Sequence, residues 1–199
     1  MKKYFICLLS SLVLFLCVSY FVGQYPSQST QERLREHAAE AKEYCLRNHL
    51  SMDYCFLVDF DVHSGRNRFF VWDFHLNKVV YSTICAHGRG GNSSLLSADF
   101  SNAHGSHCSS VGRYKVGVSR TMFNHTQIPC LELWGMDPTC SNAHARGILI
   151  HPSVAQIPTW PLPMLHRTLG CFGVSLRGFN KLKQFKEQTN QPVLLWAYN

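Results

Sequence analysis

The sequence predicts a mainly β domain with one helix before the strands and one short helix near the C-terminus. The prediction rests on short runs rich in β-branched and aromatic residues, on the turn residues between them, and on helical spacing of apolar residues before the first run. The expected strands are residues 54–62, 68–74, 79–85, 114–119, 130–134, 147–150 and 192–198, and the expected helices are 30–48 and 178–189. Short turns join the first three strands, which indicates an antiparallel meander. With 199 residues and 46% hydrophobic content, the chain can bury one sizeable core.

The N-terminal segment, residues 1–23, is expected to be a signal anchor or a signal peptide. Lys2 and Lys3 precede an apolar run over residues 4–22, which is long enough to span a bilayer. No good small-x-small cleavage site follows, so an uncleaved single-span anchor in the inner membrane is favoured and a cleaved signal peptide stays as the alternative. In both cases the remaining chain is expected to be exported to the periplasm or cell envelope.

A linker and a helix are expected over residues 24–50. The first residues of this segment are polar and include Pro26, which is typical of a linker. Ser29 and Glu32 have the spacing of a capping box, which predicts a helix that begins at about residue 30. The residues expected on the buried face of that helix are Leu34, Ala38, Ala41 and Cys45.

In the β-rich domain, residues 51–199, polar residues gather in the connections. Asp59 and Asp61 alternate with apolar residues in the first strand, so their carboxylates are expected to face solvent or to be hydrogen-bonded. The segment 86–112 is rich in Gly, Ser, Asn and His, which is too polar for a core and indicates ordered loops over a site. Residues 152–163 contain four prolines and are expected to form a loop.

The most informative stretch is residues 167–175, read together with His151. Gly170 and Gly173 surround Cys171 in a small-residue turn, and His151 ends an apolar run. A thiolate attacks a carbonyl far better than a thiol, so a reactive cysteine needs a base or a pKa below the usual value of about 8.5. Glycines let the backbone approach a substrate, so that the N–H groups of Gly170 and Cys171 can stabilise an oxyanion. We therefore interpret Cys171 as a nucleophile of lowered pKa and His151 as its base, with a buried structural cysteine as the alternative.

The other cysteine, histidine and serine patterns are weaker. Seven of the nine cysteines follow the N-terminal segment, an odd number without a Cys-x-x-Cys pair, so Cys171 is the candidate free thiol and the pairing of the others stays open. Residues 85–87 and 104–108 combine Cys with His, but neither repeats a standard zinc-ligand spacing, so no metal and no cofactor are expected. Ser109 and Ser110 lack a Gly-x-Ser-x-Gly elbow and are expected to line the site or to cap a turn.

The formal net charge of +7 is spread along the chain without a dense basic block. This distribution favours general attraction to polyanionic envelope material over nucleic-acid recognition. No nucleic-acid partner is therefore expected.

Several motifs taken together resemble one known family. The matching segments are residues 58–60, 63–74, 85–88, 100–102, 105–114, 141–143, 151 and 170–171. In this order they resemble the murein L,D-transpeptidase (YkuD-like) catalytic family, in the branch common in Bacteroidetes-type envelopes. The resemblance covers residues 55 to 198.

The sequence departs from the family pattern around the cysteine. The wider family has Ser/Thr-His-Gly-Cys with an arginine after one hydrophobic residue, and here Leu169 replaces the histidine and Gly173 stands at the arginine position. The branch pattern Gly-Arg-Ser-x-Gly-Cys-Pro is also altered, at His166, Thr168 and Phe172. The nucleophile and base are kept, so the reaction class is expected to survive, with weakened or redirected activity as an alternative.

The resemblance implies a β-sandwich-like catalytic domain that acts, as a monomer, on peptidoglycan stem peptides. The implied reaction is acyl transfer through a Cys171 thioester, with His151 as base and Gly170 in the oxyanion site. The implied substrate-binding residues are Asn102, Ser109, Ser110, Arg167 and Thr168. The alternatives are an L,D-carboxypeptidase or endopeptidase with the same Cys–His site and a non-catalytic wall-binding module.

Overall fold

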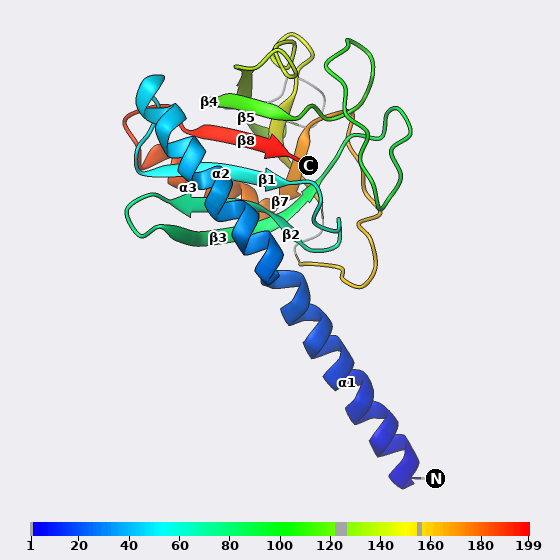
Figure 1. Cartoon of the computed structure of the whole chain (residues 1–199). Helices are drawn as coiled ribbons and strands as arrows, with labels where there is room; N and C mark the ends of the chain where they lie inside the picture. Colours follow the sequence, from blue (N-terminus) through cyan, green and yellow to red (C-terminus); the bar gives the residue numbers. More distant parts are fainter. Residues whose placement is uncertain (1, 122–126, 155–156) are drawn as a thin grey trace.

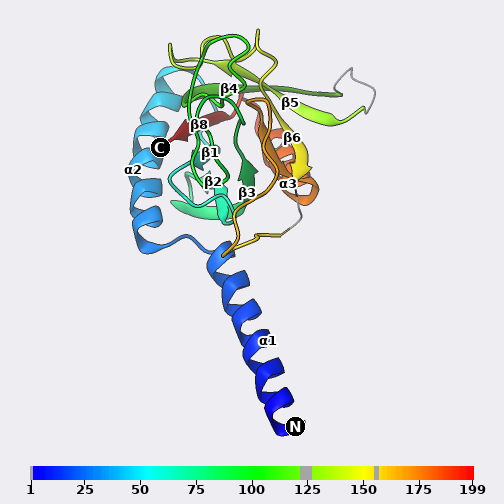
Figure 2. The same cartoon turned by 90° about the vertical axis from the view of Figure 1, so that its right-hand side faces the viewer.

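The computed structural model describes residues 2–121, 127–154 and 157–199. Its strands form one closed barrel, with two helices packed against it and a third helix projecting away from it (Figures 1 and 2). The elements are α1 (Lys2–Gln24), α2 (Gln28–Arg47), β1 (Tyr54–Asp59), β2 (Asn67–Asp73), β3 (Lys78–Ala86), β4 (Gly112–Thr121), β5 (Pro129–Gly135), β6 (Leu149–Val154), β7 (Phe172–Ser175), α3 (Leu176–Glu187) and β8 (Leu194–Tyr198).

The strand order around the barrel is β1-β2-β3-β7-β6-β5-β4-β8. The predicted antiparallel meander is confirmed, because β2 pairs antiparallel with both β1 and β3. The expectation of a β-sandwich is wrong. The last strand, β8, pairs in parallel with β1 and antiparallel with β4, so it joins the two ends of the sheet and leaves one closed layer.

Apolar side chains fill the barrel and also cover part of its outer face. The interior cluster includes Phe56, Phe69, Tyr114, Phe172 and Leu195, all fully buried. A second cluster lies between α2 and the outer face of β1, β2 and β8. Since α2 covers that face, all residues of β2 are buried, although strands exposed on one side alternate between buried and exposed positions.

Helix α2 buries the face that the sequence predicts. Its buried residues include the four expected ones: Leu34, Ala38, Ala41 and Cys45. The N-cap is Ser27 rather than Ser29, because the Ser27 hydroxyl accepts the Thr30 N–H at 3.2 Å and the helix begins at Gln28. The helix is tied to the barrel by Arg33, which donates to the buried Asp59 carboxylate at 2.7 and 2.9 Å.

Strands β1, β6 and β7 differ from the strands predicted from the sequence. β1 ends at Asp59 instead of residue 62, since the Asp59 side chain and carbonyl accept the N–H groups of Asp61 and Val62 and turn the chain. β6 continues through His151 to Val154, where a proline-rich loop is expected from residue 152. The short strand β7 has no counterpart in the sequence prediction.

Helix α1 is long and apolar enough to cross a membrane, and its apolar side chains are largely exposed. Its C-terminal end is held on the barrel. The Arg66 guanidinium donates to the carbonyls of Val22 and Tyr25 at 3.0 and 2.9 Å, and the Asn67 amide donates to Gln24. Figure 1 shows α1 leaving the barrel beyond this junction.

Candidate functional site

The parallel pairing of β6 with β7 brings the predicted base on β6 close to the chain segment that carries the predicted nucleophile. Ile150 pairs with Phe172, and His151 pairs with Gly173. Ile150 and Phe172 point into the barrel core, where both are fully buried. Because successive side chains of a strand point to opposite faces, His151 points to the outer face of the barrel, and Cys171 lies two residues before its pairing partner Gly173.

Cys171 lies just before β7 and is partly exposed. Its Sγ lies 3.6 Å from the Gly147 carbonyl, to which the thiol donates. Burial raises the pKa of the Cys171 thiol, and a backbone hydrogen bond at Leu149 and the positive charge of Arg146 lower it in part. The expectation of a lowered thiol pKa in the free protein is therefore wrong, because desolvation outweighs the favourable interactions.

His151 has the environment of a neutral base. Its Nδ1 lies 3.4 Å from the Pro152 carbonyl, so an Nδ1 proton can be donated there and Nε2 keeps its lone pair. Burial lowers the pKa of His151, with a further decrease from His166 that the Pro152 carbonyl opposes. Neutral thiol and neutral imidazole are thus the resting forms at neutral pH.

Gly170 occupies a position that no other residue fits. Its φ is +115°, and a Cβ built there would lie 2.7 Å from the Cys108 carbonyl oxygen and 2.8 Å from Ile148 Cδ1. Its N–H donates to the Thr168 hydroxyl at 3.2 Å. The Gly170 N–H is therefore already bonded, unlike the free oxyanion donor that the sequence analysis expects.

Thr168 and Ser109 support the same turn from two sides. The Thr168 hydroxyl donates to the Cys171 carbonyl at 2.7 Å, and the Ser109 hydroxyl donates to the Gly170 carbonyl at 3.2 Å. Ser109 also accepts the Gly88 N–H at 2.9 Å. Both side chains are buried, so their hydroxyls fix the backbone of the turn.

The other predicted substrate-binding residues are also bonded within the protein. The Ser110 hydroxyl donates to the Ser101 carbonyl at 2.8 Å, and Arg167 donates to the Ser93 carbonyl at 2.7 Å. Asn102 lies in the same loop region, and its side chain bonds Pro138, Ser141 and Asn142. Of the predicted set, the structure thus brings Ser109 and Thr168 to the cysteine turn, and Asn102, Ser110 and Arg167 form hydrogen bonds within the surrounding loops.

Arg146 is a residue of this site that the sequence analysis does not identify. It lies in the turn segment between β5 and β6, and its charge acts on the Cys171 thiol. Its guanidinium bonds four oxygens of the loop over residues 101–110. The sequence signal is weak, because a single arginine in an irregular segment has no periodicity or motif spacing.

A buried arginine also joins the loops around the cysteine turn to the barrel. Arg68 on β2 is fully buried and donates to the Cys85 carbonyl at 2.7 Å, and its Nη2 lies 2.8 Å from His87 Nδ1. The His87 Nε2 then donates to the Ser94 carbonyl at 2.8 Å. Burial, with a smaller effect of the Arg68 charge, lowers the pKa of His87 to about 4, so His87 is neutral.

The described part of the chain holds several free thiols and a pocket away from the cysteine turn. All nine cysteines are free thiols. Within residues 2–121, 127–154 and 157–199, no three His, Cys, Asp or Glu side chains are placed to hold a metal ion together.

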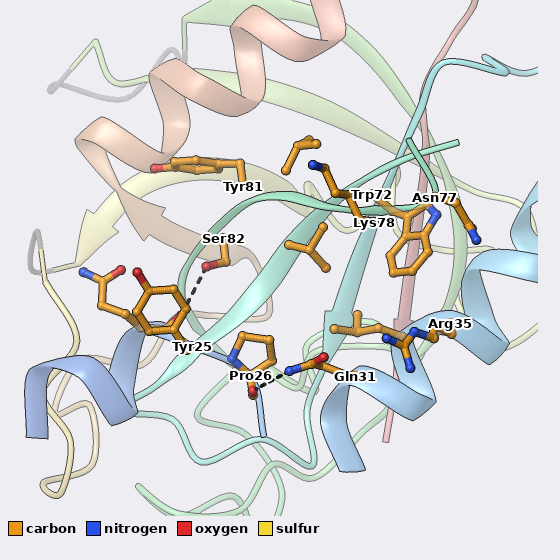
Figure 3. Close-up of a pocket in the computed structure, with 13 residues that line it drawn as sticks. Tyr25, Pro26, Gln31, Arg35, Trp72, Asn77, Lys78, Tyr81 and Ser82 are labelled. Atoms are coloured by element: carbon orange, nitrogen blue, oxygen red, sulfur yellow. Dashed lines mark hydrogen bonds between the residues drawn. The ribbon is translucent and has the colours of Figure 1, made fainter. Parts of the chain in front are cut away.

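A pocket of about 500 Å³ lies at the junction of α1, α2 and β3, where Tyr25, Arg35, Trp72, Lys78 and Tyr81 line it (Figure 3). None of the predicted site residues lines this pocket.

A comparison with family models identifies the family of this chain. A family model described as the L,D-transpeptidase catalytic domain (YkuD_2) matches residues 27–198. Among solved structures, the chain is similar to the crystal structure of the L,D-transpeptidase (residues 123–326) from Xylanimonas cellulosilytica DSM 15894. The sequence identity is 14% and the TM-score 0.40, and the match covers 78% of this chain and 68% of that chain. No curated protein matches the chain.

Proposed function

Because this chain belongs to the L,D-transpeptidase catalytic domain family, we propose that it is a peptidoglycan-modifying cysteine acyltransferase that forms a thioester on Cys171. The observation that carries the proposal is the β6–β7 pairing, which sets His151 opposite Gly173, two residues after Cys171. A binding module for the cell wall does not need a thiol next to an imidazole with a free Nε2. A catalytic function therefore explains more of the residues at this site than a wall-binding function does.

The reaction starts from the neutral pair. Nε2 of His151 takes the proton of Cys171 while Sγ attacks the carbonyl carbon of the third stem residue. A carbon–sulfur bond forms, and the carbonyl electron pair moves to oxygen, where the backbone N–H of Cys171 stabilises it. The imidazolium then gives its proton to the departing amine of the terminal D-amino acid as the carbon–nitrogen bond breaks. The product is a thioester on Cys171.

The acyl acceptor decides the outcome. An amine of a neighbouring stem attacks the thioester, gives a proton to His151 and releases the Cys171 thiol, which makes a crosslink. Water in the same position gives carboxypeptidase or endopeptidase activity. The thioester face is open on the barrel exterior, since Cys171 and His151 are both partly exposed, and either acceptor can approach from there.

Muropeptide analysis tests the nucleophile. We expect full-length protein in a neutral detergent to change the muropeptide pattern of isolated sacculi, and Cys171→Ala to lose this activity with a similar melting temperature. Intact mass spectrometry of the wild type should show an acyl adduct that Cys171→Ala cannot form. Cys17→Ala, an exposed thiol in α1, is the matched control and should keep both activity and adduct. Equal turnover by wild type and Cys171→Ala would exclude Cys171 as nucleophile.

We also propose that α1 is an uncleaved single-span anchor with the barrel exported. The Arg66 and Asn67 bonds to the carbonyls at the end of α1 support this proposal, since cleavage after Tyr25 would remove all of their acceptors. Intact mass of membrane-extracted protein should give the full chain. A mature N-terminus between residues 20 and 28 in the soluble fraction would identify a cleaved signal peptide instead.

A further inference from the structure

Arg146 forms the densest group of hydrogen bonds near the nucleophile. Its Nη1 donates to the Ser101 carbonyl at 2.8 Å and to the Ser110 hydroxyl at 2.7 Å. Its Nη2 donates to the Ser106 hydroxyl at 3.1 Å and to the Cys108 carbonyl at 2.6 Å. Each Nη carries two hydrogens, so these four bonds use all four. The Nη atoms therefore have no donor left for a substrate carboxylate.

All four partners of Arg146 are neutral oxygens. Among the described residues, no carboxylate forms an ion pair with Arg146. An arginine side chain stays protonated, and a partly buried positive charge without a counterion acts over several ångströms on any charge that forms nearby. Its field is thus available to a group that becomes negative during a reaction.

The group that becomes negative nearby is the Cys171 sulfur. A Cβ built on Gly170, the residue before Cys171, would lie 3.3 Å from Arg146 Nη2 and 2.7 Å from the Cys108 carbonyl oxygen. The shortest Arg146 bond is to that same carbonyl. The guanidinium therefore holds in place the backbone on which the Gly170–Cys171 turn packs, and it neutralises the negative end of a carbonyl dipole that points toward the turn.

We propose that Arg146 is a positioning residue of the nucleophile, which locks the loop over residues 101–110 beneath the Gly170–Cys171 turn and supplies the fixed positive charge that stabilises the sulfur when it becomes anionic. The inference rests on the proposed function of Cys171. It assigns the Nη groups to the protein rather than to the substrate. The lowering of the Cys171 thiol pKa by Arg146 agrees with this assignment.

Alkylation of Cys171 against pH separates the charge of Arg146 from its structural role. The full-length protein in a neutral detergent is treated with iodoacetamide, and modification of the peptide that contains Cys171 is followed by mass spectrometry. In Arg146→Gln the inflection should move upward by about one pH unit, because the positive charge is lost. In Arg146→Lys the charge is kept, so the inflection should stay close to wild type.

Turnover should respond differently from alkylation. Neither Arg146→Gln nor Arg146→Lys can form all four hydrogen bonds of the Arg146 guanidinium. The Gly170–Cys171 turn therefore moves, and kcat should fall on the order of 100-fold. KM should change little, because Arg146 does not bind substrate. Arg113→Gln is the matched control. Arg113 bonds Asp137 at the other end of the same turn segment, so its loss should lower stability without shifting the Cys171 inflection.

Three results would overturn the inference. They are an unchanged inflection in Arg146→Gln, an equal upward shift in both Arg146 variants, or an equal shift in Arg113→Gln. If Arg146→Gln does not fold, Arg146→Lys still decides, since a shift there as large as one unit excludes a role of the charge. Failure of the proposed function is distinguishable, because it would leave the wild type without turnover, whereas alkylation needs no substrate.

Discussion

Two regions of the molecule use charged side chains in opposite ways: the loops that surround Cys171, named the thiol end, and the pocket between α1, α2 and β3, named the α1 end. Near Cys171, Arg146 donates all of its Nη hydrogens to oxygens of the loop over residues 101–110. At the α1 end, Arg35 and Lys78 line the pocket of Figure 3 with exposed side chains and, within the described part of the chain, bond no acceptor. Removing a partner from a buried bond leaves an unsatisfied group, whereas an exposed cation keeps its water. The thiol end should therefore tolerate substitution far less than the α1 end.

The largest expected effect is at Gly170. Gly170→Ala puts a Cβ against the Cys108 carbonyl and Ile148 at a φ of +115°, so we expect a loss of about 2–5 kcal/mol in the free energy of unfolding, together with loss of turnover. Gly105→Ala is the control, since Gly105 has a φ of +70° and nothing within 4 Å of a built Cβ. It should cost only about 1–2 kcal/mol. Urea unfolding measures both, and equal losses would show that crowding at Gly170 is unimportant.

Acid should destabilise the thiol end through His87. The pKa of His87 falls from an ordinary 6.5 to about 4 in the folded protein, so the unfolded chain binds more protons between these values. Stability is thus fully present above pH 6.5 and is lost as the pH falls toward 4, by about 3 kcal/mol. His87→Gln should flatten this part of the stability curve, measured by urea unfolding at pH 4 to 7. A curve as steep as that of the wild type would assign the acid sensitivity to other groups.

The smallest expected effect is at the α1 end. Arg35→Gln with Lys78→Gln should change the free energy of unfolding by less than about 0.5 kcal/mol and leave turnover unchanged, because both side chains are exposed. The same urea and muropeptide measurements apply. A loss above about 1 kcal/mol would contradict the expected difference in tolerance of substitution between the thiol end and the α1 end.

Local patterns predicted the parts of this molecule that depend on neighbouring residues. The β1–β2–β3 meander follows from β-rich runs and short turns, and the buried face of α2 follows from helical spacing. The motif residues likewise indicated Cys171 and His151, and the β6–β7 pairing sets His151 opposite Gly173, two residues after Cys171.

The remaining features depend on residues far apart in the sequence. β7 has only four residues and begins directly after the glycine turn, so it carries no clear periodicity. Barrel closure pairs β1 with β8 at opposite ends of the domain. Arg146 meets its acceptors 36 to 45 residues away. The thiol pKa was mispredicted for a related reason, because desolvation comes from the packing around Cys171 rather than from its motif.

The position of β8 has a consequence for the order in which the protein folds. This last strand lies between β1 and β4, so the barrel has a gap until Leu194–Tyr198 takes its place. Pairing β1 with β8 closes a loop that contains nearly the whole domain. The entropic cost of closing this loop precedes any gain from the contacts, which makes folding slow. Until then, β1 and β4 each present an unpaired edge that can join another chain. The final residues thus complete the core and also end the period in which the chain is prone to aggregate.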